Sequence, residues 1–276
     1  MSPAVDILFL AHKRPEFTRA SLAALLANTD MEANLLCIYT DGEQENQGAK
    51  EALDARHGKT LIIQVELGKH GGPVACINDR LEKSSAEFIA KVDNDTIVPP
   101  GWLPACLDLM RRYRNVDLLG IEPWTPDAKL FPRWVEPRAE ILDAPTFGLK
   151  LKNMQVRTPR PVSHIGGIGV FRRSAFERFG RPVPHSQDGR FGFTEWQWQN
   201  PGMVKAFIDP PLPVFLLDHL PFEPWRSLSR KYEQEGIQRN VGWEYDAVKH
   251  RALWDWAFAS GARLGAEKID VGGPRL

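Results

Sequence analysis

The chain has 276 residues, of which 35 are Lys or Arg and 35 are Asp or Glu, so its formal net charge at neutral pH is zero. This balance excludes a protein held to nucleic acid or to an anionic membrane by its overall charge, although a local basic groove remains compatible with it. No run of 18 apolar residues occurs, so we expect no membrane-spanning helix, and the N-terminus lacks the basic start of a signal peptide. A chain of this length, 43% apolar, suits one large α/β domain.

The three cysteines, Cys37, Cys76 and Cys106, are far apart and lie in apolar segments. A zinc site requires paired spacings, and a secreted disulfide framework requires an even and denser set of cysteines. We therefore expect three buried free thiols and a cytoplasmic protein.

The first 120 residues alternate between short apolar runs and amphipathic stretches. The apolar runs contain almost no polar residues, which is typical of strands that are covered on both faces. They occupy residues 5–11, 35–40, 61–67, 88–92 and 116–121.

Helical patterns lie between these runs. Pro15 opens one at a favourable first-turn position, Pro73 opens another, and a third carries Leu103, Leu107 and Met110 on one side. Strands and helices that alternate in this way predict βαβ units and a mostly parallel sheet flanked by helices.

A parallel sheet binds its ligands at the carboxyl ends of the strands, where the connecting loops diverge. The residues that follow the predicted strands form a polar and charged set, at positions 11–14, 41–43, 68–72 and 93–95. We expect the functional site at this edge.

Beyond residue 121 the pattern becomes less regular. Prolines recur from 122 to 161, together with Trp124 and Trp134, and predict an irregular excursion packed over the sheet. A polar and aromatic loop is expected over residues 188–200. Further strands are expected at 164–171, 204–208 and 214–217, with a short helix at 174–179 and a helical tail at 225–265.

The strongest motif is Asp93-Asn94-Asp95, which follows a predicted buried strand and precedes Pro99-Pro100-Gly101-Trp102. Side chains alternate along an extended chain, so Asp93 and Asp95 are expected to project to the same side. Two carboxylates placed this way repel each other unless a cation or a hydrogen-bond donor lies between them. Mg²⁺ or Mn²⁺ prefers such oxygen ligands and shares itself with substrate phosphates. A plain Asp-rich turn is the alternative, because Asp and Asn are ordinary turn residues.

With this motif in place, the chain resembles the glycosyltransferases of the GT-A fold, in particular the large inverting family-two-like group. The resemblance covers most of the chain up to about residue 220. It is carried by residues 5–16 (VDILFLAHKRPE), 38–42 (IYTDG), 71–78 (GGPVACIN), 93–103 (DNDTIVPPGWL) and 166–174 (GGIGVFRRS).

The resemblance implies an α/β, Rossmann-like domain that binds a nucleotide sugar and catalyses transfer over residues 1–221. Within it, residues 1–121 would form the donor half and residues 122–221 the acceptor half. Residues 222–276 would form a C-terminal helical arm.

The resemblance also implies which residues bind the donor. Asp41 would accept a hydrogen bond from the nucleobase or ribose, Gly71 and Gly72 would let the backbone approach the donor, and Asp93 would face the ribose or a metal-bound water. The complete implied set is Ala11, His12, Arg14, Asp41, Gly71, Gly72, Asn78, Asp93 and Asn94. Several of these residue types also serve as turn, N-cap or solvated residues, so a purely structural role stays open for them.

Metal ligation and catalysis are implied for a second set. Asp93 and Asp95 belong to the metal site, with His219 as an acceptable imidazole ligand of Mn²⁺. Glu195 is the implied catalytic base, since aromatic neighbours raise the pKa of a carboxyl by desolvation, and Asp188 is the reserve candidate. The family usually has a second acid after the position of Glu195, where this chain has Trp196.

The expected reaction is therefore transfer of a sugar from a nucleotide-diphosphate sugar to an acceptor hydroxyl, with Mn²⁺ or Mg²⁺ on the diphosphate. A saccharide is the acceptor we expect first, and a modified nucleic-acid base or a protein remains open. Two alternatives share the fold, namely a sugar-nucleotide nucleotidyltransferase and a non-catalytic module that binds nucleotide sugars or carbohydrate. A dinucleotide-dependent oxidoreductase is disfavoured, because no G-x-G-x-x-G follows the first strand.

Overall fold

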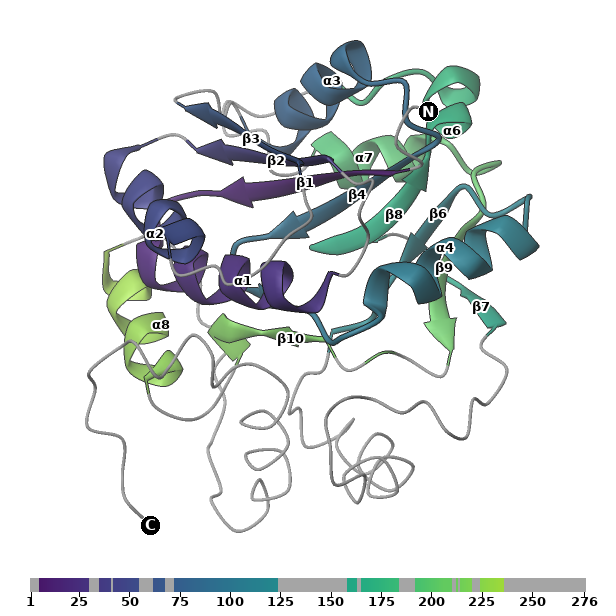
Figure 1. The fold of residues 1–276 in the computed structure, drawn as a ribbon. Helices are drawn as coiled ribbons and strands as arrows, with labels where there is room; N and C mark the ends of the chain where they lie inside the picture. Colours follow the sequence, from purple (N-terminus) through teal and green to yellow (C-terminus); the bar gives the residue numbers. More distant parts are fainter. Residues whose placement is uncertain are drawn as a thin grey trace, which may run out of the picture.

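The structure is a computed structural model, shown as a ribbon in Figure 1. It describes residues 5–29, 35–40, 42–54, 62–67, 72–123, 158–162, 165–183, 192–209, 212, 214–219 and 224–235. Most of the predicted Pro-rich excursion and most of the predicted C-terminal arm therefore lie outside the described residues.

An eight-stranded sheet with the order β3-β2-β1-β4-β8-β6-β9-β7 forms the centre of the molecule. Its first four strands are parallel: β1 (Val5–Ala11), β2 (Leu35–Thr40), β3 (Ile62–Leu67) and β4 (Phe88–Asp93). The remaining strands are β6 (Leu118–Gly120), β7 (Thr158–Pro161), β8 (Ile168–Arg172) and β9 (Lys205–Asp209). Four of the seven pairings are parallel, which confirms the predicted mostly parallel sheet.

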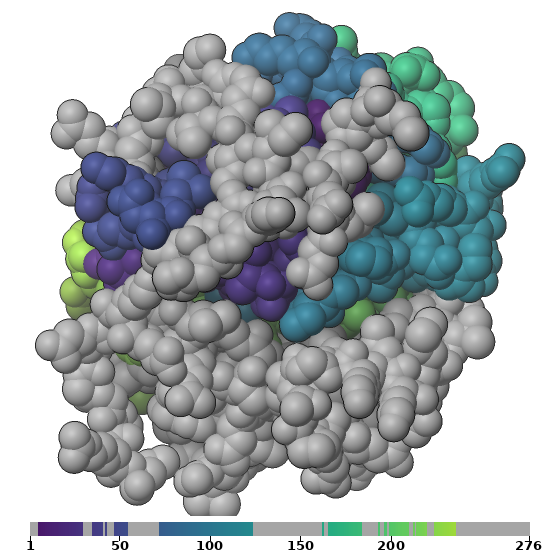
Figure 2. Space-filling model, in the orientation of Figure 1, coloured from purple at the N-terminus to yellow at the C-terminus, as the bar shows by residue number. Residues whose placement is uncertain are grey.

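Helices cover both faces of the sheet (Figure 1). One face of the sheet carries α1 (Pro15–Asn28), α2 (Glu43–Asp54) and α4 (Trp102–Arg112). These three helices lie on the side of the molecule that Figure 2 shows. The other face carries α3 (Pro73–Lys83), α6 (Arg173–Phe179) and α7 (Gly192–Gln199). Two apolar cores result, because β1 sends alternate side chains such as Ile7 and Leu8 into opposite layers.

Two expectations for the irregular regions are wrong in part. The predicted loop at 188–200 contains helix α7, in which Phe193, Trp196 and Gln197 recur at helical spacing and are buried. The end of the Pro-rich excursion forms β7 at the edge of the sheet, paired with β9. An edge strand tolerates the two prolines of Thr158–Pro161, because one side of it needs no ladder hydrogen bonds.

Gln197 fixes α7 to the chain that leads into β8. Its side chain is completely buried, accepts a hydrogen bond from the N–H of Ile165 (2.8 Å) and donates one to the carbonyl of Ile165 (3.0 Å). A side-chain amide that binds both the N–H and the carbonyl of one residue makes the same pair of hydrogen bonds as a neighbouring strand would. The helix and this segment are therefore held in one register.

A second, smaller layer lies beyond the end of β4. β5 (Thr96–Ile97) pairs with β10 (Phe215–Leu216), and a 3₁₀ turn η1 (Leu217–His219) follows directly. The N–H of Leu217 donates to the carbonyl of Asp95 at 2.6 Å. Two segments far apart in the sequence are joined at this point.

The first part of the predicted arm is helix α8 (Trp225–Gln234), which packs on α1. The ring of Phe17 lies edge-on to Trp225 (5.8 Å between centroids) and to Tyr232 (5.4 Å). The Tyr232 hydroxyl donates to the Glu16 carboxylate. Burial alone raises the pKa of Glu16, but this hydrogen bond and the charge of Lys231 outweigh burial and lower it.

The three cysteines are free and buried, as predicted. Within the described residues, every helix falls short of the length and apolar character that crossing a membrane requires.

We predict that Gln197→Leu lowers the free energy of unfolding by about 2–4 kcal/mol, because the buried N–H and carbonyl of Ile165 lose their partners and each unsatisfied group costs about 1–3 kcal/mol. Urea denaturation followed by circular dichroism measures the change. Gln199→Leu, at an exposed position of the same helix, is the control and should change stability by less than about 0.5 kcal/mol. Equal losses in the two variants would contradict this role of Gln197.

Candidate active site

The site begins with the alternation of β4. Phe88, Ala90 and Val92 face the core beneath α1, α2 and α4, whereas Ile89 faces the opposite core. Lys91 and Asp93 continue the face of Ile89, because side chains on one face of a strand recur every second residue.

Lys91 and Asp93 form a buried ion pair on this face. The Lys91 ammonium lies 2.6 Å from Asp93 Oδ1 and donates a second hydrogen bond to the carbonyl of Gly167 (3.2 Å). The Lys91 side chain is only 5% exposed. A Cβ at position 167 would come within 3.0 Å of Asp93 Oδ2, so a glycine is needed there for this close approach.

A turn at Asn94 and Asp95 then reverses the direction of the chain. Asn94 fixes this turn against the start of α1: its amide donates to the carbonyl of His12 (3.2 Å) and to the Thr18 hydroxyl (2.9 Å). Its own carbonyl oxygen accepts a hydrogen bond from Arg14 (2.9 Å). The middle residue of the motif is therefore a structural anchor.

One polar stripe of α1 supports the whole turn. Thr18, Ser21 and Asn28 recur at intervals of three to seven residues on one side of the helix and are buried. Ser21 donates to the carbonyls of Asp93 (3.2 Å) and Thr96 (2.5 Å), and Asn28 donates to the carbonyl of Val98 (2.7 Å). The stripe satisfies backbone carbonyls that the turn leaves without ladder partners.

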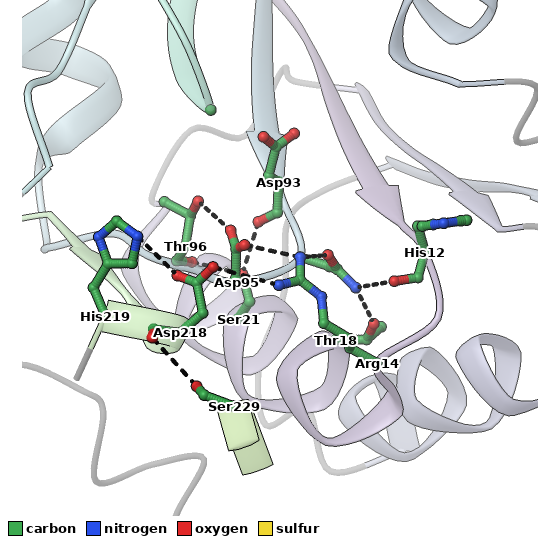
Figure 3. A network of polar contacts seen from close by, with 12 residues as sticks. His12, Arg14, Thr18, Ser21, Asp93, Asp95, Thr96, Asp218, His219 and Ser229 are labelled. Atoms are coloured by element: carbon green, nitrogen blue, oxygen red, sulfur yellow. Dashed lines mark hydrogen bonds and ion pairs between the residues drawn. The ribbon is translucent and has the colours of Figure 1, made fainter. Parts of the chain in front are cut away.

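Arg14 lies between two carboxylates beyond the turn, as Figure 3 shows. Its Nη2 is 2.8 Å from Asp95 Oδ2, and its Nη1 is 3.7 Å from Asp218 Oδ2. Asp218 comes from η1, which also places His219 Nε2 3.7 Å from Asp218 Oδ1. Ser229 of α8 donates to the carbonyl of Asp218 (3.3 Å), so the arm helps to hold this part of the site.

Burial and charge set the pKa values of this network. Burial, reinforced by the charge of Asp95, raises the pKa of Asp218 to about 7. Burial alone would also raise the pKa of Asp95, but the Arg14 guanidinium outweighs it and holds the pKa of Asp95 below its usual range. Burial lowers the pKa of His219 and thereby favours a neutral imidazole. The site therefore carries more negative charge than Arg14 balances.

The described residues of the donor-binding prediction divide into two groups. Arg14, Asp93 and Asn94 lie in the network, together with the backbone of His12. Ala11 is the buried last residue of β1, Gly72 precedes α3 with φ of +90°, and the Asn78 amide donates to the carbonyl of Pro182 (3.0 Å). Asp41 and Gly71 lie outside the described residues.

The predicted catalytic residues are less completely placed. Glu195 lies in α7, with only its backbone described, and Asp188 lies outside the described residues. Trp196, which stands where the family usually has a second acid, is a core residue: its ring stacks on Phe176 at 5.0 Å, and its Nε1 donates to the carbonyl of Gly180.

The expectation that Asp93 and Asp95 project to the same side is wrong. Asn94 and Asp95 form a turn, which ends the extended alternation on which that expectation rested. Each carboxylate has its own cationic partner, Lys91 for Asp93 and Arg14 for Asp95. A donor therefore separates the two charges, as the sequence argument required.

Sequence reasoning missed Lys91 and Asp218 as site residues. A lysine inside the apolar run FIAKVD, two positions before an acid, is the signal for Lys91, since residues at that spacing share one face of a strand. Asp218 directly precedes His219, so the sequence also offered Asp218 as a candidate metal ligand. In the part of the chain that the structure describes, no three His, Cys, Asp or Glu side chains are grouped closely enough to hold a metal ion.

Several solved structures share this fold. The mannosyltransferase PcManGT from Pyrobaculum calidifontis, in complex with GDP-Man and Mn²⁺, has a TM-score of 0.53 and 12% identity over 99% of this chain and 77% of that chain. TarS 1–349 of S. aureus has a TM-score of 0.50 and 12% identity over 97% of this chain and 75% of that chain. GalNAc-T7 with UDP, GalNAc and Mn²⁺ has a TM-score of 0.50 and 12% identity over 78% of this chain and 43% of that chain. At this identity the likeness establishes the fold, which agrees with the predicted GT-A class.

The sequence itself decides the family. No curated protein matches the chain, but the family described as Glycosyl transferase family 2 matches residues 6–180, which is more than half of it. The matched region contains the D-N-D turn, Arg14, Lys91 and Gly167, and it ends before Glu195, Asp218 and His219. The chain therefore belongs to glycosyl transferase family 2, and it is a glycosyltransferase of the GT-A fold.

Proposed function

We propose that this glycosyltransferase moves a sugar from a nucleoside-diphosphate sugar to an acceptor hydroxyl, with a divalent ion and with inversion at the anomeric carbon. The observation that carries the proposal is the network of Asp95, Asp218 and His219 at the carboxyl end of β4. Ligands of such sheets bind at that edge.

The kinds of donor atom in this network suit Mn²⁺ or Mg²⁺, but in the described structure Asp95, Asp218 and His219 are not grouped closely enough to hold an ion on their own, and Arg14 lies between the two carboxylates. Asp218 Oδ1 is buried and has no hydrogen-bond partner among the described residues, and burial, reinforced by the charge of Asp95, raises the pKa of Asp218 to about 7. Carboxylate oxygens and a neutral imidazole are accepted ligands of Mn²⁺. Asp95, Asp218 and His219 would hold the ion, which would neutralise charge on the departing diphosphate.

Asp93 has a different task in this proposal. Asp93 binds Lys91 through Oδ1 on the other face of β4, and its carboxyl group is suited to accept a hydrogen bond from a ribose hydroxyl of the donor. Two fold neighbours support a nucleotide donor, because one was solved with GDP-Man and Mn²⁺ and the other with UDP, GalNAc and Mn²⁺. We also propose that Asp41, Gly71 and Gly72 complete the nucleotide pocket.

Glu195 is the proposed catalytic base, which removes the proton of the acceptor hydroxyl as that oxygen attacks the anomeric carbon. Its helix is fixed to the site, since Gln197 binds Ile165 and the nearby carbonyl of Gly167 binds Lys91. Attack from the face opposite the diphosphate inverts the configuration. Asp188 is the reserve candidate for the same task.

The proposal also covers the class of acceptor and the cellular compartment. We propose a saccharide acceptor, with a modified nucleic-acid base or a protein as alternatives for the test to separate. Three buried free thiols support a reducing, cytoplasmic location.

The proposal predicts that one nucleotide sugar stabilises the protein only when Mn²⁺ or Mg²⁺ is present. A thermal-shift panel of UDP-, GDP-, CMP- and dTDP-sugars measures this, each with the ion and with EDTA. At a ligand concentration of about 100 Kd, the melting temperature should rise by about 5–10 °C. Stabilisation that is the same in EDTA would refute the metal requirement. Pyrophosphate release from a nucleoside triphosphate and a sugar phosphate would support the nucleotidyltransferase alternative.

Asp95→Asn should reduce sugar transfer by roughly 10²–10³-fold, the usual effect of removing one charge-stabilising group from an active site. The amide keeps the shape of the side chain, so the melting temperature should change little. The control is Asp108→Asn, at an exposed position of α4 where the Asp108 carboxylate pairs with Arg112. This substitution should leave transfer unchanged. Full activity of Asp95→Asn would remove Asp95 from the mechanism.

Glu195→Gln should bind the donor with wild-type affinity and lower kcat by about 10²–10⁴-fold, because the amide cannot accept the acceptor's proton. Donor affinity from calorimetry and kcat from product formation separate the two effects. Glu177→Gln, at an exposed position of α6, is the matched control. If Glu195→Gln retains full turnover, the base is a different residue and Asp188 is the next to test.

A further inference from the structure

Arg14 stands where a cation is required and makes contacts that a bound ion would also make. Its guanidinium bridges Asp95 and Asp218, whose carboxylates come from separate segments of the chain. Two buried carboxylates at close range are stable only with positive charge between them. In the structure described here, Arg14 supplies that charge.

The second cation of the site differs from Arg14 in one respect. Lys91 extends from the middle of a central strand, is 5% exposed, and is enclosed by Asp93 and the carbonyl of Gly167. Arg14 is 14% exposed and lies at the N-terminus of α1, directly after Lys13, whose φ of +42° is unusual for a residue with a side chain. Lys91 is thus held within the sheet, whereas Arg14 lies on the short connection between β1 and α1.

Arg14 also contacts residues other than the two carboxylates. Its Cζ lies 5.2 Å from the centre of the Phe17 ring, and Nη2 donates to Asn94 as well as to Asp95. A guanidinium that leaves the carboxylates keeps part of its environment, which makes the exchange feasible. It also matches two phosphate oxygens through paired hydrogen bonds.

We propose that Arg14 is an internal substitute for the divalent ion: it holds Asp95 and Asp218 together when the ion is absent, and the ion displaces it toward the donor diphosphate. This inference rests on the proposed metal-dependent function. It gives Arg14 two successive partners, first the carboxylates and then the phosphates.

The proposal has a quantitative consequence for ion binding. A site that Arg14 closes nine-tenths of the time binds its ion about tenfold more weakly than the open site. Removal of the guanidinium should restore that affinity, while it should weaken binding of the complex between the ion and a diphosphate. A residue with only a structural role would weaken both or neither.

The test compares Mn²⁺ binding to wild type, Arg14→Met and a control, with no nucleotide present. Isothermal titration calorimetry or the electron paramagnetic resonance signal of free Mn²⁺ gives the affinities. Arg14→Met should bind Mn²⁺ about tenfold more tightly and, with Mn²⁺ saturating, inorganic pyrophosphate about fivefold more weakly. Arg19→Met, on the same helix but paired with Glu51 at 2.7 Å, should match wild type in both measurements.

Each outcome is decisive. Unchanged or weaker Mn²⁺ binding by Arg14→Met overturns the role of Arg14 and leaves the proposed function standing. If neither protein binds Mn²⁺ even with pyrophosphate, the metal requirement itself is refuted, and the role of Arg14 with it. Should Arg14→Met fail to fold, ¹⁵N-labelled wild type serves instead, with the Arg14 Nε–H signal identified by its loss in Arg14→Lys. Saturating Mg²⁺ should shift this signal, and an unmoved signal overturns the proposal.

Discussion

The repulsion between three acidic side chains gathered at the end of one strand is the constraint around which this site is built. Asp93, Asp95 and Asp218 share a largely buried space, where charges interact more strongly than in water. The chain places Lys91 and Arg14 among them, one on each side of the D-N-D turn. The polar stripe of α1 then fixes the turn so that each acid keeps its own partner. Without these partners the acids would become protonated or move apart.

The beginning of the C-terminal arm contacts both α1 and the residues of the site. α8 packs on α1 through Trp225 and Tyr232, and Ser229 binds the backbone of Asp218. One helix of the sheet layer thus contacts both the D-N-D turn and α8. Sequence reasoning placed a boundary near residue 221, but the contacts of Asp218 cross it. The beginning of the arm therefore helps to hold the backbone of Asp218 in place.

Strands β1 to β4 and helices α1, α3 and α4 could be predicted because their signals are local, whereas α2 and β5 were not predicted. Unbroken apolar runs marked β1 to β4 almost to the residue, and Pro15 and Pro73 marked the starts of α1 and α3. Helix α7 was missed because its buried positions include Gln197, whose amide oxygen and nitrogen both bind Ile165 of another segment. Contacts of that kind arise from the fold and leave no local pattern.

Both acids of the D-N-D motif were expected at the metal site, with Asp93 also facing the ribose, and the structure gives them different cationic partners. Both carboxylates follow the same strand, but only a description of the turn reveals that Asp93 faces the Lys91 layer and Asp95 faces α1. The Lys91 ammonium changes partners with difficulty, because its side chain is 5% exposed and would have to leave a buried position within the sheet. A carboxylate paired with an arginine at the edge of a loop has no such restriction. Exchange of cations is therefore confined to the Asp95 side, which is the side that Asp218 and His219 also face.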